Sequence, residues 1–171
     1  TSSKLFKSQG YDFIGVCETH VTASCFKSWD KKARQAGYRI LPNHARVKGF
    51  IGNEGSLQSN EGGEWFMAKQ HLQVQSAFPR SSARRSCAAG QSSLDGFQAA
   101  IVHMKGYSII VVAVYGLQGG VAANTSRFSK LGAMLNSFSL PWVAVGDFNI
   151  QAHIMDRSKW FDKPNGGGLS S

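Results

Sequence analysis

The pattern of hydrophobic and polar residues predicts strands and a helix in the first part of the chain. Apolar runs at residues 11–17 and 38–42 predict two strands, and residues 4–9 predict the end of a short helix before Gly10. Between the two strands, apolar residues recur at every fourth position, which predicts an amphipathic helix ending at Gly37. The residues of this apolar stripe are Val21, Cys25, Trp29 and Ala33.

The strongest strand signals lie in the second half of the chain. Two apolar runs flank Lys105 and Gly106, which predicts a β-hairpin because glycine supplies the positive φ of a tight turn. Residues 109–114 are apolar without alternation, as expected for a strand covered on both faces. Residues 142–145 show the same signal, and we expect a second doubly buried strand there.

Helical periods stand on either side of this last strand. Residues 122–140 predict a helix that ends before Pro141, and residues 151–161 predict a shorter one. The residues expected to face inward from the longer helix are Phe128, Leu131 and Leu135.

The middle of the chain has a weaker pattern. Residues 64–74 offer one strand candidate, and residues 76–93 predict a loop rich in Ser, Ala and Arg. Helices and strands that alternate around a hairpin predict an α/β fold, with helices covering a mixed sheet. A chain of 171 residues fits one domain, which we place at residues 1–163, followed by a flexible tail at 164–171.

The chain is strongly basic, with a net charge of +9 from 19 Lys and Arg against 10 Asp and Glu. Such an excess favours polyanionic partners, with nucleic acid or an anionic membrane surface as the leading candidates. A soluble basic surface without a special partner explains the charge equally well. The charge alone therefore leaves both interpretations open.

Cysteine content and hydropathy indicate the setting of the protein. The three cysteines Cys17, Cys25 and Cys87 cannot all pair within the chain, and we expect them to be reduced. No apolar stretch is long enough to span a bilayer. We therefore expect an intracellular protein, with the nucleus among the candidate compartments, and we expect a monomer.

Polar residues follow three of the predicted strands. The first strand ends in Glu18, the hairpin strand ends in Tyr115, and the last ends in Gly-Asp-Phe-Asn at residues 146–149. In α/β sheets, ligands usually bind beyond the carboxyl ends of the strands. If these strands run side by side, Glu18, Asp147 and Asn149 converge on one small volume.

Two carboxylates and an amide are suited to a hard divalent cation. Mg²⁺ and Mn²⁺ prefer such oxygen ligands, and no His or Cys cluster in the sequence has the spacing of a zinc site. Without a cation, neighbouring carboxylates repel each other. A divalent ion would remove this repulsion and act as a Lewis acid toward a phosphoryl oxygen.

Each of these residues also has a purely structural explanation. The segment at 146–149 can form an Asx turn, Thr19 can cap a helix, and Tyr115 can be a half-buried aromatic residue. His103 lies in the apolar hairpin, where a hydrogen-bonded core histidine is expected. The case for a site rests on the occurrence of all these groups in order at strand ends.

Three segments resemble the endonuclease/exonuclease/phosphatase superfamily. They are "DFIGVCETH" at 12–20, "IIVVAVYG" at 109–116 and "PWVAVGDFN" at 141–149. This superfamily includes apurinic endonucleases, endonuclease domains of non-LTR retroelements, DNase I-like nucleases and inositol-phosphate phosphatases. The resemblance covers residues 5–163 in order and is loosest at 44–93. It is more specific to the superfamily than to a substrate.

The resemblance implies a four-layer α/β sandwich and Mg²⁺-dependent cleavage of a phosphoester by an activated water. Glu18 matches the metal-binding glutamate of the family. Asp147 matches the aspartate that orients or deprotonates the water, and we also expect it to contact the metal. Asn149 matches the asparagine that contacts the scissile phosphate, and Tyr115 matches the tyrosine that supports this phosphate.

The sequence also departs from the family pattern. The family begins with a strand that carries a site asparagine and ends with an Asp-His pair, whereas none of the five histidines here follows an aspartate. Leu117 and Gln118 stand where the family often has Pro and Asn, and "GGEWFMA" replaces a Gly-Gly-apolar strand start. We interpret the chain as a member that is truncated at both ends, or as a decayed retroelement copy.

We therefore expect Mg²⁺-dependent, endonuclease-like hydrolysis of nucleic acid, DNA above all, with activity that the missing Asp-His pair can impair. Two alternatives remain open: an inactive remnant that binds nucleic acid, and a phosphatase of phosphoinositides or other phosphomonoesters on the same fold. The candidate contacts to nucleic acid are Lys48, Arg80, Arg84 and Arg85.

Overall fold

The computed structural model describes residues 10–47, 60–78 and 96–161 of the chain. The elements before residue 78 are β1 (Phe13–Val16), α2 (Ala23–Gln35), β2 (Tyr38–Asn43), β3 (Arg46–Val47), β4 (Asn60–Glu61), β5 (Glu64–Lys69) and β6 (Gln73–Ser76). The elements after residue 96 are β7 (Phe97–Met104), β8 (Tyr107–Tyr115), α4 (Gly120–Asn136), β9 (Trp142–Asp147) and α5 (Ala152–Ser158). Helices combine with mixed and antiparallel sheets, which confirms the predicted α/β class.

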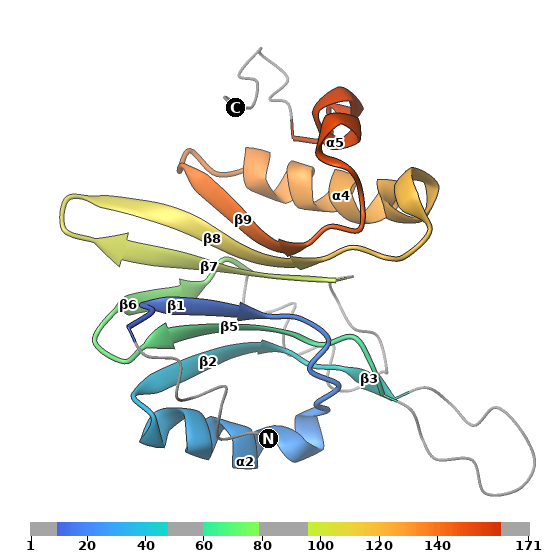
Figure 1. Ribbon diagram of the computed structural model, residues 1–171. Helices are drawn as coiled ribbons and strands as arrows, with labels where there is room; N and C mark the ends of the chain where they lie inside the picture. The colour runs from blue at the N-terminus through green and yellow to red at the C-terminus, as the bar shows by residue number, and fades with distance from the viewer. Residues whose placement is uncertain (1–9, 48–59, 79–95, 162–171) are drawn as a thin grey trace, which may run out of the picture.

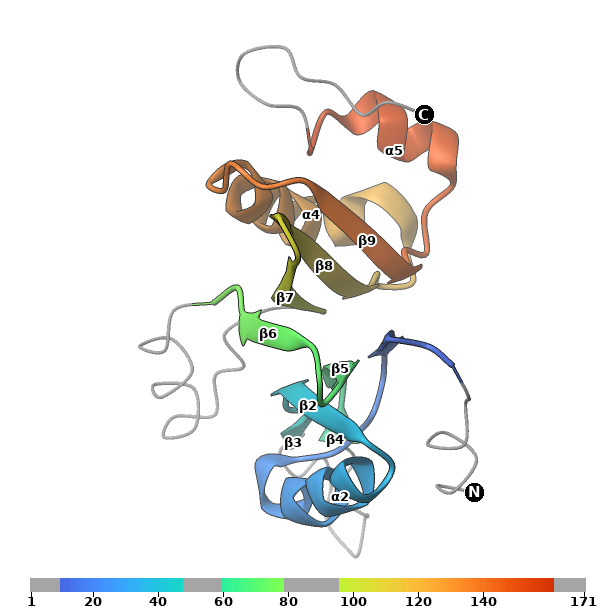
Figure 2. The same ribbon diagram turned by 90° about the vertical axis from the view of Figure 1, so that its left-hand side faces the viewer.

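Two sheets lie face to face at the centre of the molecule (Figure 1). The first sheet has the strand order β1-β5-β2, and the second sheet has the order β6-β7-β8-β9. Helix α2 covers the outer face of the first sheet, whereas α4 and α5 lie on the outer side of the second (Figure 2). Strands β3 and β4 form a separate two-stranded ribbon.

Separate apolar cores hold these layers together. Beneath α2, Trp65 and Met67 of β5 are buried together with Ala33 of the helix. Between the two sheets, Phe66 and Ala68 of β5 pack with residues of β7 and β8. Successive side chains of a strand point to opposite faces, so β5 contributes to both cores in turn.

The third core lies between the second sheet and α4. Phe128, Leu131 and Leu135 are almost fully buried there, at 0%, 0% and 1% exposure, which confirms the predicted inward face of this helix. They pack against the residues of β7 and β8 that face away from the first sheet, including Phe97 and Ile110.

The predicted hairpin is confirmed. Strands β7 and β8 pair in antiparallel register from Phe97 opposite Val114 to Met104 opposite Tyr107. Gly106 lies in the turn with φ +89°, a conformation that favours glycine. Residues 110–114 of β8 are all buried, because α4 covers one face and the first sheet covers the other.

The prediction of a doubly buried strand at 142–145 was wrong about burial. Strand β9 exists, but Val143 is 40% exposed and Val145 is 44% exposed. In the described part of the chain, β9 pairs only with β8 and is an edge of the second sheet. Strand β1 covers the inner face of β9 only in part, and a Cβ atom at Gly15 would lie 3.6 Å from Cγ2 of Val145.

The single strand expected at 64–74 is two strands. The chain turns after Lys69, where the Leu72 N–H donates a hydrogen bond to the Lys69 carbonyl at 3.0 Å. Strand β5 before this turn belongs to the first sheet, and β6 after it belongs to the second. The apolar pattern runs through the turn, so hydrophobicity alone did not reveal it.

The apolar stripe predicted for α2 was partly wrong. Ala33 is buried and Trp29 packs edge-on against Trp65, but Cys25 is exposed. Each step of four residues rotates a side chain by about 40° around a helix of 3.6 residues per turn. A stripe of strict four-residue spacing therefore leaves the buried face, and Phe26 packs there instead.

Some predictions concern parts of the chain that the structure does not describe. These are the short helix end at 4–9, most of the loop predicted at 76–93, and the tail at 164–171. No helix within the described ranges is long and apolar enough to cross a membrane.

Candidate functional site

The carboxyl ends of β8 and β9 lie next to each other, as the sequence predicted. The two strands pair in parallel, and their register places Tyr115 opposite Asp147. The Gly116 N–H donates a hydrogen bond to the Asp147 carbonyl at 2.6 Å, which extends this pairing by one step. The tyrosine and the aspartate therefore lie side by side at the same edge of the second sheet.

Strand β1 reaches this edge from the other sheet. The condition that β1 runs beside the other two strands is not met, because within the described residues β1 pairs only with β5 of the first sheet. It crosses the inner face of the second sheet at Gly15, where a Cβ atom would lie 3.0 Å from Cβ of Ala113. This close approach brings Glu18, just after β1, to the ends of β8 and β9.

The side chains of Glu18 and Tyr115 influence each other electrostatically. The interaction of the Tyr115 hydroxyl with the Glu18 carboxylate is the main cause that raises the pKa of Tyr115. Desolvation and the negative charges of Glu18 and Asp147 raise that pKa further. The three predicted residues Glu18, Tyr115 and Asp147 therefore form one electrostatic cluster.

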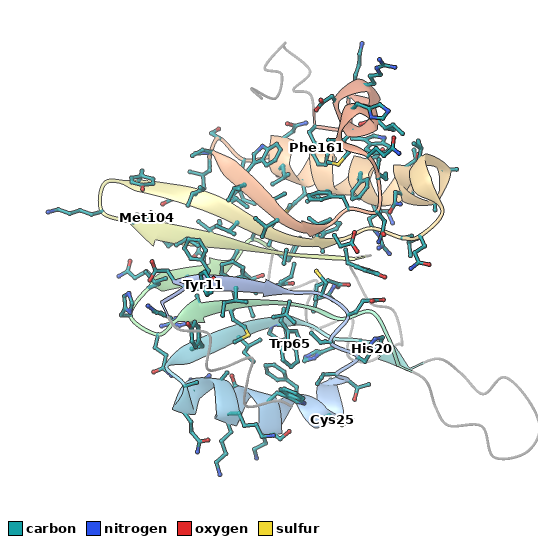
Figure 3. All side chains as sticks on the ribbon, viewed as in Figure 1. Tyr11, His20, Cys25, Trp65, Met104 and Phe161 are labelled. Carbon is teal, nitrogen blue, oxygen red and sulfur yellow. The ribbon has the colours of Figure 1, made fainter. Side chains whose placement is uncertain are left out.

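The segment after Glu18 is held in an unusual backbone conformation. Glu18 and His20 have positive φ values of 51° and 52°, which non-glycine residues seldom adopt. The Thr19 N–H donates to the Gly63 carbonyl at 2.9 Å, and the His20 N–H donates to the Gly62 carbonyl at 3.0 Å. These bonds tie the segment to the residues just before β5. Figure 3 shows His20 at this end of the molecule.

Asp147 and Asn149 form an Asx turn at the end of β9. The Asn149 N–H donates to Oδ1 of Asp147 at 3.0 Å, and Nδ2 of Asn149 donates to the Gly116 carbonyl at 2.6 Å. The structural explanation considered for this segment is thus correct, and it does not exclude a site. The turn instead fixes both side chains beside Tyr115.

Sequence reasoning missed a third carboxylate, that of Glu64. This first residue of β5 is only 2% exposed, and its Oε2 accepts a hydrogen bond from Nδ2 of Asn43 at 2.7 Å. Burial raises the pKa of Glu64 to about 7, and the Glu18 carboxylate adds to this rise. The signal in the sequence was the acidic residue in "GGEWFMA", at the start of an otherwise apolar strand.

The carboxylates of Glu18, Glu64 and Asp147 all influence the pKa of Cys17. Its thiol donates a hydrogen bond to the Val114 carbonyl at 3.2 Å. Burial raises its pKa to about 11, and the charges of Glu64, Asp147 and Glu18 contribute to the rise. Cys17 thus lies between the sheets, close to each of these acidic groups.

Arg127 of α4 brings a positive charge to this acidic end. Its Nη1 donates a hydrogen bond to the Tyr115 carbonyl. Its charge lowers the pKa values of both Glu64 and Tyr115, against the stronger effects that raise them. Gly96 makes room for it, since a Cβ atom there would overlap the guanidinium group.

The oxygen atoms of this end are of the kind that Mg²⁺ and Mn²⁺ bind. Glu18 and Asp147 can supply carboxylate oxygens, and Asn149 still has its amide oxygen available because its Nδ2 makes the bond to Gly116. Among the described residues, no three His, Cys, Asp or Glu side chains are already arranged as a metal site. These oxygen atoms are of the right chemical type for the cation. The carboxylates of Glu18 and Asp147 come from strand ends of two different sheets.

The remaining candidates lie elsewhere. Lys48, Arg80, Arg84 and Arg85 fall outside the described residues. Nδ1 of His103 lies 2.9 Å from Oγ of Ser108 across the hairpin, in agreement with its predicted structural role. The N-cap position of helix α2 is Thr22, whose side chain makes no capping hydrogen bond, so Thr19 does not cap the helix.

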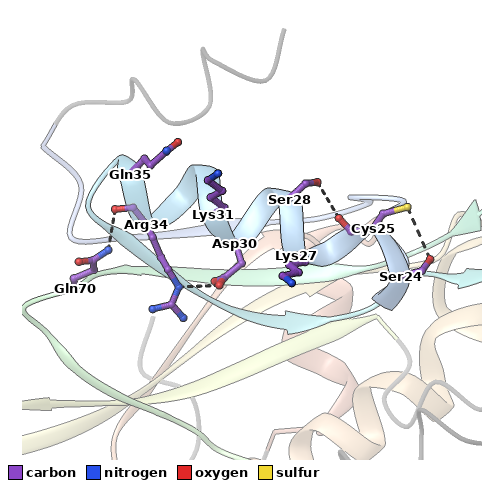
Figure 4. Close-up of a pocket in the computed structure, with 9 residues that line it drawn as sticks. All are labelled: Ser24, Cys25, Lys27, Ser28, Asp30, Lys31, Arg34, Gln35 and Gln70. Atoms are coloured by element: carbon purple, nitrogen blue, oxygen red, sulfur yellow. Dashed lines mark hydrogen bonds and ion pairs between the residues drawn. The ribbon is translucent and has the colours of Figure 1, made fainter.

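A hollow of about 1060 Å³ lies along the outer side of α2 (Figure 4). It is lined by polar and basic side chains, including Lys27, Lys31 and Arg34, and Arg34 forms an ion pair with Asp30 at 2.7 Å. This side of α2 faces away from the first sheet. The hollow therefore does not contain the acidic cluster at the strand ends.

No protein-family model matches the chain, and no curated protein matches it.

Proposed function

We propose that this chain is a nuclease-like domain of the endonuclease/exonuclease/phosphatase superfamily that hydrolyses phosphodiester bonds of DNA with Mg²⁺ or Mn²⁺. The observation that carries this proposal is the cluster of Glu18, Tyr115 and Asp147, which the sequence placed on three separate strand ends. The succession of helix, two facing sheets and helices supports the finer assignment to a four-layer, DNase I-like sandwich.

In this proposal, Glu18 and Asp147 would hold the divalent ion. When bound, the ion neutralises phosphate charge and acts as a Lewis acid. Asp147 also orients the attacking water and accepts its proton. Its Oδ1 already accepts the Asn149 N–H, which keeps the carboxylate in one orientation.

Asn149 and Tyr115 are the proposed phosphate contacts. One Nδ2 hydrogen of Asn149 is used by the Gly116 carbonyl, and the other remains to donate to a phosphate oxygen. The Tyr115 hydroxyl interacts with Glu18 and can donate a hydrogen bond to a phosphate oxygen as negative charge develops there. Donors fixed in this way need little reorganisation during the reaction.

The charge distribution favours nucleic acid over a small phosphate ester. The strand ends are acidic, yet the whole chain carries a net charge of +9. Positive charge outside the site stabilises a long polyanion at many phosphates, because each contact releases counterions. A small ester occupies the site alone and gains little from this charge.

One observation favours a second function, nucleic-acid binding without cleavage. The resemblance implies a histidine after an aspartate that stabilises the phosphate, and none of the five histidines follows an aspartate. A chain without this group can retain the basic surface and the fold while its chemical step is slow.

Nicking of supercoiled plasmid DNA tests the proposal. We expect Mg²⁺-dependent conversion to open circles, which EDTA stops, and no comparable turnover of soluble inositol phosphates. DNA binding without nicking would support the second function. Faster turnover of inositol phosphates than of DNA would instead assign the fold to a phosphatase.

A further inference from the structure

Asn124 is a buried polar residue of α4 that the proposed reaction does not use. It is 0% exposed and comes first in the buried stripe of this helix, ahead of Phe128, Leu131 and Leu135. An apolar side chain at position 124 would continue the stripe, whereas a buried amide costs free energy unless its hydrogen bonds are made. The groups that this amide binds therefore explain its place in the core.

The Asn124 amide binds one short segment of backbone after β8. Its Oδ1 accepts a hydrogen bond from the Leu117 N–H at 2.7 Å. Its Nδ2 donates to the Leu117 carbonyl at 2.7 Å and to the Gly120 carbonyl at 2.9 Å, which uses both of its hydrogens. Asn124 thus binds both backbone groups of Leu117 and ties the segment after β8 to α4.

A second side chain of α4 binds the same segment. Arg127, three residues after Asn124, donates through Nη1 to the Tyr115 carbonyl. Residues three apart lie on the same side of a helix. Helix α4 therefore binds the backbone on both sides of Gly116, at Tyr115 and at Leu117.

Gly116 is the point where this segment meets the candidate site. Its N–H donates to the Asp147 carbonyl at 2.6 Å, and its carbonyl accepts a hydrogen bond from Nδ2 of Asn149 at 2.6 Å. A Cβ atom at Gly116 would overlap the Phe148 carbonyl, so the two backbones are in close contact. The place of the Gly116 carbonyl therefore sets the orientation of the Asn149 amide.

We propose that Asn124 is a positioning residue of the candidate site: it fixes Leu117 and thereby holds the Gly116 carbonyl where this carbonyl orients Asn149. The inference rests on the proposed function, because that function assigns Asn149 to the phosphate. Asn124 touches no reacting group. It acts through hydrogen bonds to Leu117 on one side of a peptide bond and from Asn149 to Gly116 on the other.

Asn124→Leu tests this inference, because leucine has a similar branched shape and continues the apolar stripe but makes none of the three hydrogen bonds. In the full chain, we expect kcat for DNA nicking to fall about tenfold and KM to change less than about twofold. Thr125→Ala is the matched control and should keep the wild-type kcat. It removes a different hydrogen bond of α4, from the Thr125 hydroxyl to the Val121 carbonyl at 2.8 Å, which stays within the helix.

Amide hydrogen exchange followed by NMR reads the same connection without catalysis. The Gly116 N–H bonds to Asp147 beyond the carboxyl end of β8, and the Ile110 N–H bonds to the Pro141 carbonyl at 2.9 Å nearer its start. In Asn124→Leu, we expect exchange at Gly116 to become at least about tenfold faster and exchange at Ile110 to change less than about twofold. A general loss of stability would instead accelerate both amides through global unfolding.

The outcomes separate this inference from the proposed function. A wild-type kcat in Asn124→Leu, an equal fall of kcat in Thr125→Ala, or equal acceleration of both amides overturns the positioning role. If the wild-type chain does not nick DNA, the proposed function fails and hydrogen exchange alone decides. Selective acceleration at Gly116 then supports the positioning role, and unchanged exchange there refutes it.

A second variant covers the case in which Asn124→Leu does not fold. Asn124→Asp keeps the acceptor for the Leu117 N–H and loses both donated hydrogen bonds. We expect the same pattern from it, a lower kcat and faster exchange at Gly116 with little change at Ile110. Wild-type values for both measurements would overturn the inference.

Discussion

The Glu18 carboxylate raises the pKa of the Tyr115 hydroxyl more than any other group does, although the two residues lie at strand ends of different sheets. Asp147 stands opposite Tyr115 on the neighbouring strand, so the tyrosine lies between both predicted carboxylates. The proposed chemistry therefore depends on one aromatic side chain that joins the two sheets at their end.

Tyr115→Phe should reduce cleavage by about 100-fold, the loss typical for one donor that stabilises developing charge. The substitution removes the hydroxyl and keeps the ring. Tyr107→Phe is the control, because Tyr107 is 60% exposed at the opposite end of β8. Initial nicking rates under saturating Mg²⁺ measure the effect. A rate for Tyr115→Phe within twofold of Tyr107→Phe would remove Tyr115 from the reaction.

Glu18→Gln and Asp147→Asn should each reduce Mg²⁺-dependent cleavage to background. Each change removes a negative charge that the cation needs and keeps the shape of the side chain. Asp156→Asn in α5, an exposed residue of the same charge, should cleave as the wild type does. Plasmid DNA and DNA with an abasic site are both suitable substrates. Wild-type rates from the Glu18→Gln/Asp147→Asn double variant would refute the assignment.

Gly15→Ala should destabilise the protein by about 1–3 kcal/mol, as overpacking of a core typically does. The new Cβ atom would lie 3.0 Å from Cβ of Ala113 and would push β1 away from β8. Thermal unfolding monitored by circular dichroism measures the loss. Adding Ala113→Gly should restore much of the stability, since it removes the opposing atom. Equal melting temperatures for Gly15→Ala and wild type would show that the sheets are not in tight contact there.

Cys17 should react much more slowly with a disulfide reagent than Cys25. The thiolate is the reactive form, and burial together with nearby carboxylates raises the pKa of Cys17 to about 11. Cys25 is exposed on α2. Reaction with Ellman's reagent at pH 8, in a Cys87→Ser background, should show one fast and one slow thiol. Two equally fast thiols would contradict the position of Cys17 between the sheets.

Glu64 should make stability depend on pH. Its pKa rises from 4.5 to about 7 on folding, so the folded protein binds this proton more tightly than the unfolded chain. The resulting stabilisation is complete below pH 4.5 and is lost as the pH rises through about 7. Urea unfolding should show a decrease of about 3 kcal/mol over this range that is absent from Glu64→Gln. The same pH dependence in both proteins would contradict the burial of Glu64.

The sequence predicted the elements whose periodicity is strong and uninterrupted. The hairpin around Gly106 and the inward face of α4 at Phe128, Leu131 and Leu135 follow from local patterns, because burial there repeats at the period of the element. The three strand ends that carry Glu18, Tyr115 and Asp147 were found in the same way.

The division into two sheets could not be predicted from these patterns. An apolar strand has the same composition whichever sheet it joins, so the sequence pattern could not show that β1 pairs with β5 and not with β8 or β9. The exposure of Val143 and Val145 on β9 depends on where the first sheet ends, which is a property of the assembled layers. Glu64 was missed because a lone glutamate before an apolar run is usually read as solvent-exposed.

In the proposed reaction, the close approach of Gly15 to Ala113 makes the geometry of the site depend on the spacing between the two sheets. Substitutions deep in that shared interior, far from any reacting atom, would then change the catalytic rate. Natural variation in the size of those interior side chains would change the spacing of the sheets and, with it, the turnover rate.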